Sequence, residues 1–270
     1  MTFSIHTHRW RPGDAPRQSR GVYILHGAGE HGMRYDRFAK YLTGLGYVVG
    51  AHDHPGHGKS DGKRGIIVPE QSLVEHAAEK LKEFTQETGA APILFGHSLG
   101  GVVAATVAFE TKVPLAGLIL SAPAFELSIS PLNRFKLNAF NAIAPYHAQD
   151  LPYDPTRLTQ DKIEQQIAID DPLMHGFKSA SYVVWLIKAG EAVFELAASL
   201  NVNTLLLIPE DDPVVSPDRA KEFAVNAPAA KIFVNCYPGY KHEVLNEMPE
   251  RRNKVMSDIG EWLRNASLLA

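Results

Sequence analysis

The stretch Pro92-Ile93-Leu94-Phe95-Gly96-His97-Ser98-Leu99-Gly100 decides the fold of this chain. Its apolar first half predicts a buried strand, and the pattern over 102–109 predicts a helix soon after it. A serine between glycines at such a strand-to-helix turn has a strained backbone that presents its hydroxyl above the sheet. The two glycines are required because a Cβ at either position would collide with neighbouring backbone. Ser98 is therefore the candidate nucleophile.

A nucleophilic serine needs an acid and a base, and both follow in the order Ser, Asp or Glu, His. The apolar run 204–208 predicts a strand, and carboxylates at 210–212 follow its end. His242 is the only histidine beyond that point, and a short loop separates it from the strand-like run 231–236. The sequence thus predicts a triad of Ser98, one of these carboxylates and His242.

Three strings in the chain resemble the monoacylglycerol lipase group of α/β-hydrolases, also described as lysophospholipase-like or as the serine aminopeptidase S33 superfamily. They are His26-Gly27-Ala28-Gly29-Glu30-His31, His52-Asp53-His54-Pro55-Gly56-His57-Gly58-Lys59-Ser60-Asp61-Gly62 and Gly96-His97-Ser98-Leu99-Gly100-Gly101. The resemblance covers residues 21–123 and 204–265 and is weaker across 124–203.

The resemblance implies specific roles for residues around the predicted nucleophile. It implies that the backbone N–H groups of Ala28 and Leu99 form the oxyanion hole. It also implies that Asp212, rather than either carboxylate before it, is the acid of the triad. One departure from the family pattern is Pro209, which stands where a glycine is expected about three residues before the acid. The loop that carries the acid is therefore expected to be set differently.

Alternating strand and helix patterns predict an α/β protein, and the resemblance specifies the α/β-hydrolase fold. We expect a mostly parallel central sheet with helices on both faces. The expected strands are 3–10, 21–26, 47–52, 91–96, 116–121, 204–208 and 231–236, with helices over 35–45, 73–84, 102–109, 134–143, 161–169, 179–200 and 256–263.

The predicted core consists of residues 1–123 and 204–270. The segment 124–203, about 80 residues, is too long for a simple connection and is expected to form an inserted helical cap. We expect this cap to bind substrate in an apolar acyl pocket above the carboxyl ends of the strands. An incomplete amphipathic face is expected to pack onto the core, with transient membrane-surface contact as the alternative; its residues are Leu132, Phe135, Lys136, Phe140 and Ile143.

Composition excludes several other classes of protein. The chain has 270 residues, of which 45% are hydrophobic and 21% charged, with a net charge of −3 and no extended basic run, so nucleic acid is not an expected partner. The single cysteine, Cys236, excludes an intramolecular disulfide and is expected in the core. Without a signal pattern or an apolar run of about 18 residues, a cytoplasmic protein is predicted.

The polar residues of the first third are expected to be structural. Histidines at 26, 31, 52, 54 and 57 lack metal-ligand spacing and are expected to hydrogen-bond loop backbone. His97 is expected to be buried against the sheet. Glu30, Arg34 and Asp53 are expected to form a charged brace under the oxyanion loop. Neither a metal nor an organic cofactor is required for the predicted chemistry.

The favoured function is a serine carboxylester hydrolase that cleaves monoacylglycerols or other single-chain esters through an acyl-enzyme intermediate. A small-ester esterase and an S33-type aminopeptidase or amidase are the enzymatic alternatives. Peptidases of this kind need acidic groups in the cap to hold a free amine, and 124–203 contains such candidates at Asp150, Asp154, Asp161, Glu164, Asp170, Asp171, Glu191 and Glu195. A non-catalytic receptor on the same fold is the remaining alternative, and a complete triad argues against it.

Overall fold

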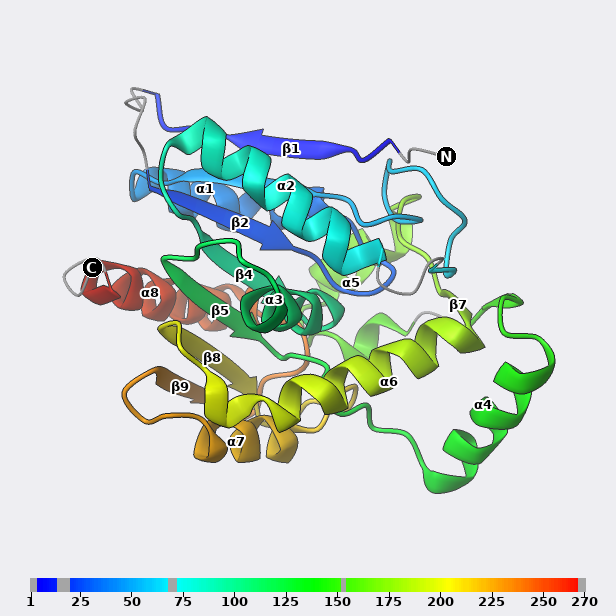
Figure 1. The fold of residues 1–270 in the computed structure, drawn as a ribbon. Helices are drawn as coiled ribbons and strands as arrows, with labels where there is room; N and C mark the ends of the chain where they lie inside the picture. The colour runs from blue at the N-terminus through cyan, green and yellow to red at the C-terminus, as the bar shows by residue number, and fades with distance from the viewer. Residues whose placement is uncertain (1–3, 14–19, 68–71, 152–153, 267–270) are drawn as a thin grey trace.

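A seven-stranded sheet forms the centre of the molecule (Figure 1). The computed structural model describes residues 4–13, 20–67, 72–151 and 154–266. All neighbouring strands run parallel except the first pair, which is antiparallel. Across the sheet the strands lie in the order β1 (Thr7–Trp10), β3 (Val48–His52), β2 (Gly21–Leu25), β4 (Ile93–His97), β5 (Gly117–Ser121), β8 (Thr204–Pro209) and β9 (Ile232–Tyr237).

Helices cover both faces of the sheet, as the sequence predicts. Side chains of one strand alternate between the two faces, so Val22 and Ile24 belong to one apolar core and Tyr23 and Leu25 to the other. The first core packs against α1 (Asp36–Gly44) and α8 (Pro249–Ala266). The second packs against α2 (Ser72–Thr88), α3 (Leu99–Glu110), α6 (Ala180–Glu195) and α7 (Pro217–Asn226).

All seven predicted strands are present within the described residues, with ends that differ by a few positions. Part of the first expected strand, residues 1–3, lies outside the described residues. The prediction for Cys236 was wrong, because its side chain is exposed. It lies on β9, which pairs with β8 alone and forms one edge of the sheet, so Phe233 and Val234 are also partly exposed.

The described residues of the segment 124–203 form three α-helices and a two-stranded antiparallel ribbon. Only α6 has an extensive buried face, through which Tyr182, Leu186 and Val193 join the core beside α3. The other elements are α4 (Pro131–Ile143), α5 (Lys162–Asp170) and the ribbon of β6 (Ala148–Asp150) with β7 (Phe177–Ser179). The proposed limits of the cap stay a prediction.

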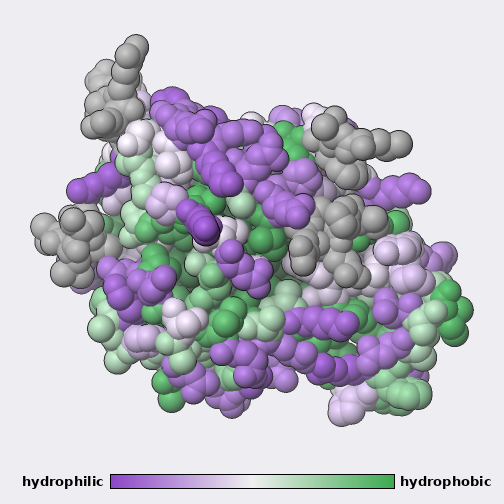
Figure 2. Space-filling model, viewed as in Figure 1, coloured by the Kyte–Doolittle hydropathy of each residue, from purple (hydrophilic) through white to green (hydrophobic). Residues whose placement is uncertain are grey.

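The expectation that the amphipathic face of α4 packs onto the core was wrong. No residue of α4 is buried, and the side chains of Leu132, Phe135 and Ile143 are 62%, 71% and 83% exposed. The helix lies at the end of the molecule farthest from α8, and apolar surface is visible there in the space-filling view (Figures 1 and 2). Among the described helices, none is long and apolar enough to cross a membrane.

Candidate active site

The turn between β4 and α3 positions Ser98. Its φ of 53° lies in the left-handed region, which is unfavourable for a residue with a side chain. The backbone can enter this turn only because Gly96 and Gly100 leave room; a Cβ on either would overlap the carbonyl oxygen of Gly100 or of Leu25. The Ser98 N–H donates to the carbonyl of Ser121 on the neighbouring strand at 3.0 Å. These contacts hold the strained serine at the carboxyl end of the sheet.

Asp212 and His242 meet beside this turn, although 30 residues separate them in the sequence. His242 Nδ1 lies 2.6 Å from Asp212 Oδ2, and both side chains are almost completely buried. The other carboxylate oxygen accepts the N–H groups of Val214 and Val215 at 2.7 and 3.1 Å. His242 and Ser98 line the same cavity. Asp211 is exposed instead.

The charges of this pair are mutually stabilising. Burial would raise the pKa of the Asp212 carboxyl, but the nearby His242 and three hydrogen bonds lower it below its ordinary value. Burial would lower the pKa of the His242 imidazole, but Asp212 raises it above its ordinary value. His242 can therefore take up a proton while Asp212 remains ionised, which is the behaviour required of a general base and its partner.

The loop after β2 faces the serine. A Cβ added to Gly27 would lie 3.4 Å from the Ser98 Cβ, which shows how closely this loop approaches the turn. Ala28 lines the same cavity as Ser98 and His242. Leu99 is the first residue of α3, so its N–H has no carbonyl partner within the helix. Ala28 therefore lines the cavity, and Leu99 directly follows Ser98 at the start of α3.

A buried ion cluster supports the loop. Glu30 accepts the Gly27 N–H at 2.5 Å and the Tyr35 hydroxyl at 2.8 Å. The guanidinium of Arg34 bonds to Glu30 at 2.9 Å and to both oxygens of Glu243 at 2.7 and 2.8 Å. Burial would raise the pKa of the Glu243 carboxyl, but Arg34 lowers it to about 2. The cluster connects the loop that carries Gly27 to the loop that carries the proposed base.

The expected brace was therefore partly wrong. Glu30 and Arg34 form it, but the third member is Glu243, and Asp53 bonds instead to His8 and to backbone N–H groups. Glu243 was missed because sequence separation hides its contact with Arg34, which is 209 positions away. Its position directly after His242 was the one signal that could have suggested it.

The histidines of the first third mostly bond to loop backbone, as predicted. His26 bonds to the Gly27 carbonyl and to the His54 N–H, and the His57 ring bonds to the Pro55 carbonyl. His31 pairs with the Asp171 carboxylate at 2.8 Å, and His52 bonds to a tyrosine hydroxyl. His97, predicted to be buried, is buried and lies 3.1 Å from the Ser121 carbonyl.

A cavity of about 370 Å³ begins at Ser98 and extends under the segment 124–203. Its apolar wall is built mainly by residues of that segment, namely Leu127, Ile129, Leu151, Leu158, Met174, Tyr182, Val183 and Leu186. The polar lining residues include Ser98, His97 and His242. A mostly apolar pocket with a few convergent polar groups is typical of a small-molecule site.

Most acidic residues of the segment 124–203 do not face this cavity. Of the eight candidates, Asp154 alone is among the described lining residues, and its carboxylate is occupied by the Thr156 N–H at 3.0 Å. Asp161 and Glu164 both bond to Arg252. The cavity also contains the positively charged Arg157 and Lys178. This distribution does not favour a subsite for a free amine.

Comparison with known proteins places these features in a family. The family described as Serine aminopeptidase, S33, matches residues 16–249. Human monoglyceride lipase is 30% identical over 97% of this chain and 87% of its own length, and the monoacylglycerol lipase of Mycolicibacterium smegmatis is 28% identical over 94% and 90%.

Solved structures agree with the sequence comparison. The monoacylglycerol lipase of Paleococcus ferrophilus superimposes with a TM-score of 0.85 at 27% identity, covering 97% of this chain and 99% of that one. A monoglyceride lipase variant from Saccharomyces cerevisiae, in complex with a substrate analog, has the same fold, with a TM-score of 0.86 at 19% identity and coverages of 97% and 92%. This chain therefore belongs to the serine aminopeptidase S33 family of α/β-hydrolases, as a homologue of the monoglyceride lipases, and is a serine carboxylester hydrolase.

Proposed function

We propose that Ser98, Asp212 and His242 are the catalytic triad. Ser98 Oγ attacks the ester carbonyl, His242 accepts its proton, and Asp212 holds the imidazole and stabilises its charged form. The alcohol leaves with a proton from His242, and a water molecule activated by the same imidazole then hydrolyses the acyl-enzyme. The 2.6 Å contact between Asp212 and His242 and the cavity shared by His242 and Ser98 support this assignment.

The Ala28 and Leu99 N–H groups are proposed as the donors to the tetrahedral oxyanion. Leu99 begins α3, so the partial positive charge of the helix N-terminus adds to its N–H dipole. Each such donor lowers the barrier by stabilising charge that develops only in the transition state. Loss of one costs on the order of 10²–10³ in rate in a serine protease.

We propose that the substrate is a monoacylglycerol or a similar ester of one acyl chain with a small polar alcohol. The apolar cavity that ends at Ser98 carries this proposal. A single acyl chain would lie along its apolar wall, with the ester at Ser98 and the glycerol hydroxyls beside polar lining residues. Each buried methylene contributes about 0.8 kcal/mol, so kcat/KM should rise with chain length until the cavity is filled.

A substrate panel tests this proposal. We expect long-chain monoacylglycerols to be cleaved with a higher kcat/KM than acetate or butyrate esters, and diacylglycerols and triacylglycerols to be poor substrates. The variant S98A is the control for background hydrolysis. Preference for acetate and butyrate esters would leave a small-ester esterase, and faster cleavage of aminoacyl arylamides than of any ester would establish the peptidase alternative.

We further propose that α4 contacts the lipid surface from which this substrate is taken. The exposed Phe135 and Ile143 carry this proposal, because apolar side chains of this size favour insertion at a lipid boundary. The double variant F135E/I143E should lose at least about tenfold in vesicle partitioning, since burial of one such side chain is worth ~1.5–3 kcal/mol. The matched control is V225E on α7, where Val225 is 84% exposed. Equal partitioning of all three proteins would refute the contact. The cytoplasmic location stays a prediction.

A further inference from the structure

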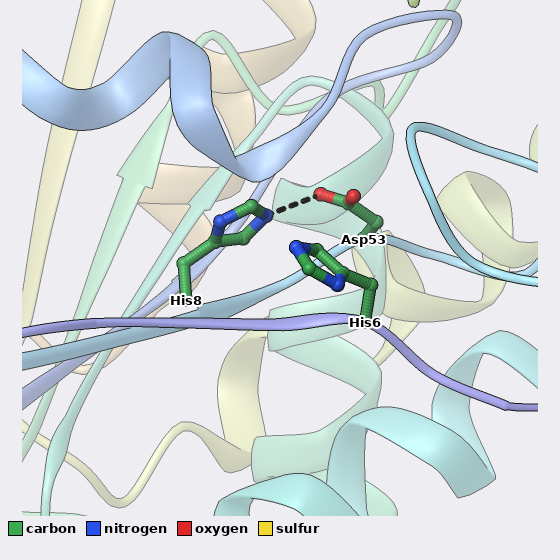
Figure 3. Close-up of side chains that lie close together, drawn as sticks. All are labelled: His6, His8 and Asp53. Atoms are coloured by element: carbon green, nitrogen blue, oxygen red, sulfur yellow. Dashed lines mark hydrogen bonds and ion pairs between the residues drawn. The ribbon is translucent and has the colours of Figure 1, made fainter.

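We propose that His6, His8 and Asp53 form a binding site for a zinc ion, separate from the catalytic site (Figure 3). Each of the three side chains offers one ligand atom, and these atoms all lie within 4.8 Å of one another. Two imidazole nitrogens and one carboxylate oxygen are ligands that Zn²⁺ prefers. With three protein ligands, a tetrahedral ion would keep its fourth position for water.

The strand pairing explains why these residues meet. His6 and His8 are two positions apart in an extended segment, so their side chains point to the same side. β1 runs antiparallel to β3, and Asp53 directly follows β3. The Asp53 N–H donates to the His6 carbonyl at 2.9 Å, which fixes the carboxylate next to the two rings. The close-up shows all three side chains turned toward a common point (Figure 3).

The three ligand side chains would need to move only a little to bind a metal ion. His8 Nε2 already lies 2.8 Å from Asp53 Oδ1, and the centroids of the His6 and His8 rings are 4.7 Å apart at 80°. Ligand atoms at ~2.0–2.2 Å from a tetrahedral zinc are separated by roughly 3.5 Å. The ion would replace the proton between His8 and Asp53 and draw His6 inward. No described residue forms a hydrogen bond with the His6 ring, so a movement of the ring breaks no hydrogen bond.

The carboxylate is held as a metal ligand should be. The Gly32 N–H donates to Asp53 Oδ1 at 2.8 Å and the Lys59 N–H to Oδ2 at 2.9 Å. Such outer contacts orient the first ligands of zinc sites and raise affinity.

One charged group near the site opposes a metal ion. The Lys59 ammonium acts on His6 and would repel a cation. Removing this charge should strengthen zinc binding, which gives the proposal a gain-of-affinity test.

Zinc at this point would fasten the N-terminal strand to the loop that follows β3. Ser60 Oγ already accepts the His6 N–H at 2.9 Å, and the Asp61 N–H donates to the Ser4 carbonyl at 3.0 Å. Gly32, which holds Asp53, begins a short 3-10 helix just after the loop that carries Glu30. An ion that binds the folded chain and not the unfolded one stabilises it in proportion to the logarithm of its concentration.

The test uses the full chain without an affinity tag, titrated with ZnCl₂ at pH 7. Equilibrium dialysis should give one zinc per chain, and Co²⁺ should give the intense visible absorption of a tetrahedral site. The variant H6A should bind zinc at least about tenfold more weakly, because it removes a direct ligand. The thermal midpoint of the wild type, but not of H6A, should rise with zinc concentration. K59Q should bind zinc more tightly than the wild type.

Two control variants separate this site from other histidines. H147A removes an exposed histidine of the segment 124–203, and H242A removes the imidazole that lies beside Asp212. Both should keep the wild-type zinc affinity. The proposal is overturned if H6A binds zinc as tightly as the wild type, or if H242A alone abolishes binding, since the ion would then occupy the catalytic site.

Discussion

Replacing Arg34 by methionine should destabilise the protein strongly, because it removes the guanidinium that pairs with two buried carboxylates, Glu30 and Glu243. The side chains of Arg34, Glu30 and Glu243 are 6%, 5% and 7% exposed. Methionine preserves the length and most of the volume of the side chain, so the cavity created is small. The effect therefore reports the loss of charge pairing.

The size of this effect follows from the pKa of Glu243. The pKa of its carboxyl is lowered from 4.5 to about 2, which corresponds to about 3 kcal/mol of stability at pH 7. Breaking a buried pair by removing one partner typically costs ~3–5 kcal/mol, which agrees. Because the pKa is lowered on folding, this contribution is complete above pH 4.5 and is lost as the pH falls toward 2.

Urea unfolding at pH 7 measures the predicted loss. R34M should lower the free energy of unfolding by ~3–5 kcal/mol, and R34K should fall between R34M and the wild type because lysine keeps the charge but not the bidentate geometry. The matched control is R134M, which removes the exposed pair of Arg134 with Glu191 and should cost under about 1 kcal/mol. A loss in R34M no larger than that in R134M would refute this account of the cluster.

Three further predictions concern the acid, the base and the buried histidines. D212N should lower kcat by ~10⁴-fold, whereas D211N, at the exposed neighbouring carboxylate, should lower kcat only slightly. A larger loss of kcat in D211N than in D212N would assign the acid to Asp211. Because Asp212 raises the pKa of His242, kcat/KM should fall as the pH drops, with a midpoint above 6.5, and a flat profile down to pH 5 would exclude this base. Burial lowers the pKa of His54 and of His57 to about 3, so their contribution to stability is complete above pH 6.5 and is lost as the pH falls toward 3. Each of these two histidines should lower the free energy of unfolding by ~2 kcal/mol at pH 5 relative to pH 7, as measured by urea unfolding. Equal stability at both pH values would contradict this.

The sheet could be predicted from sequence because buried parallel strands appear as short apolar runs between helical patterns. Edge strands weaken this inference. β9 begins with an apolar run like that of a central strand, yet it pairs on one side only, so Cys236 and Val234 are exposed. Residue types alone do not show whether a strand lies at the edge or in the centre of the sheet.

The amphipathic face of α4 illustrates a second limit. An apolar stripe predicts that a helix is covered, but not by what, and Phe135 remains exposed in the isolated chain. Short elements escaped prediction as well. The strands β6 and β7 have only three residues each, too few to establish a periodic pattern.

Residues at the site were predictable where a local motif or chain order constrains them, as for Ser98 and His242. Contacts between distant charged residues were not. Arg34 meets Glu243 and His8 meets Asp53 only because the fold brings distant segments of the chain together. The sequence alone does not distinguish a charged residue that is buried and paired from one that is exposed to solvent.

The measurement that tests the central claim most directly is covalent trapping of the nucleophile. A fluorophosphonate probe is added to the wild type and to S98A, and the labelled peptide is identified by mass spectrometry, with monoacylglycerol hydrolysis followed in parallel. The account predicts one label, on Ser98, with hydrolysis lost in proportion to labelling and S98A neither labelled nor active. A label on another serine such as Ser121, together with an active S98A, would contradict it.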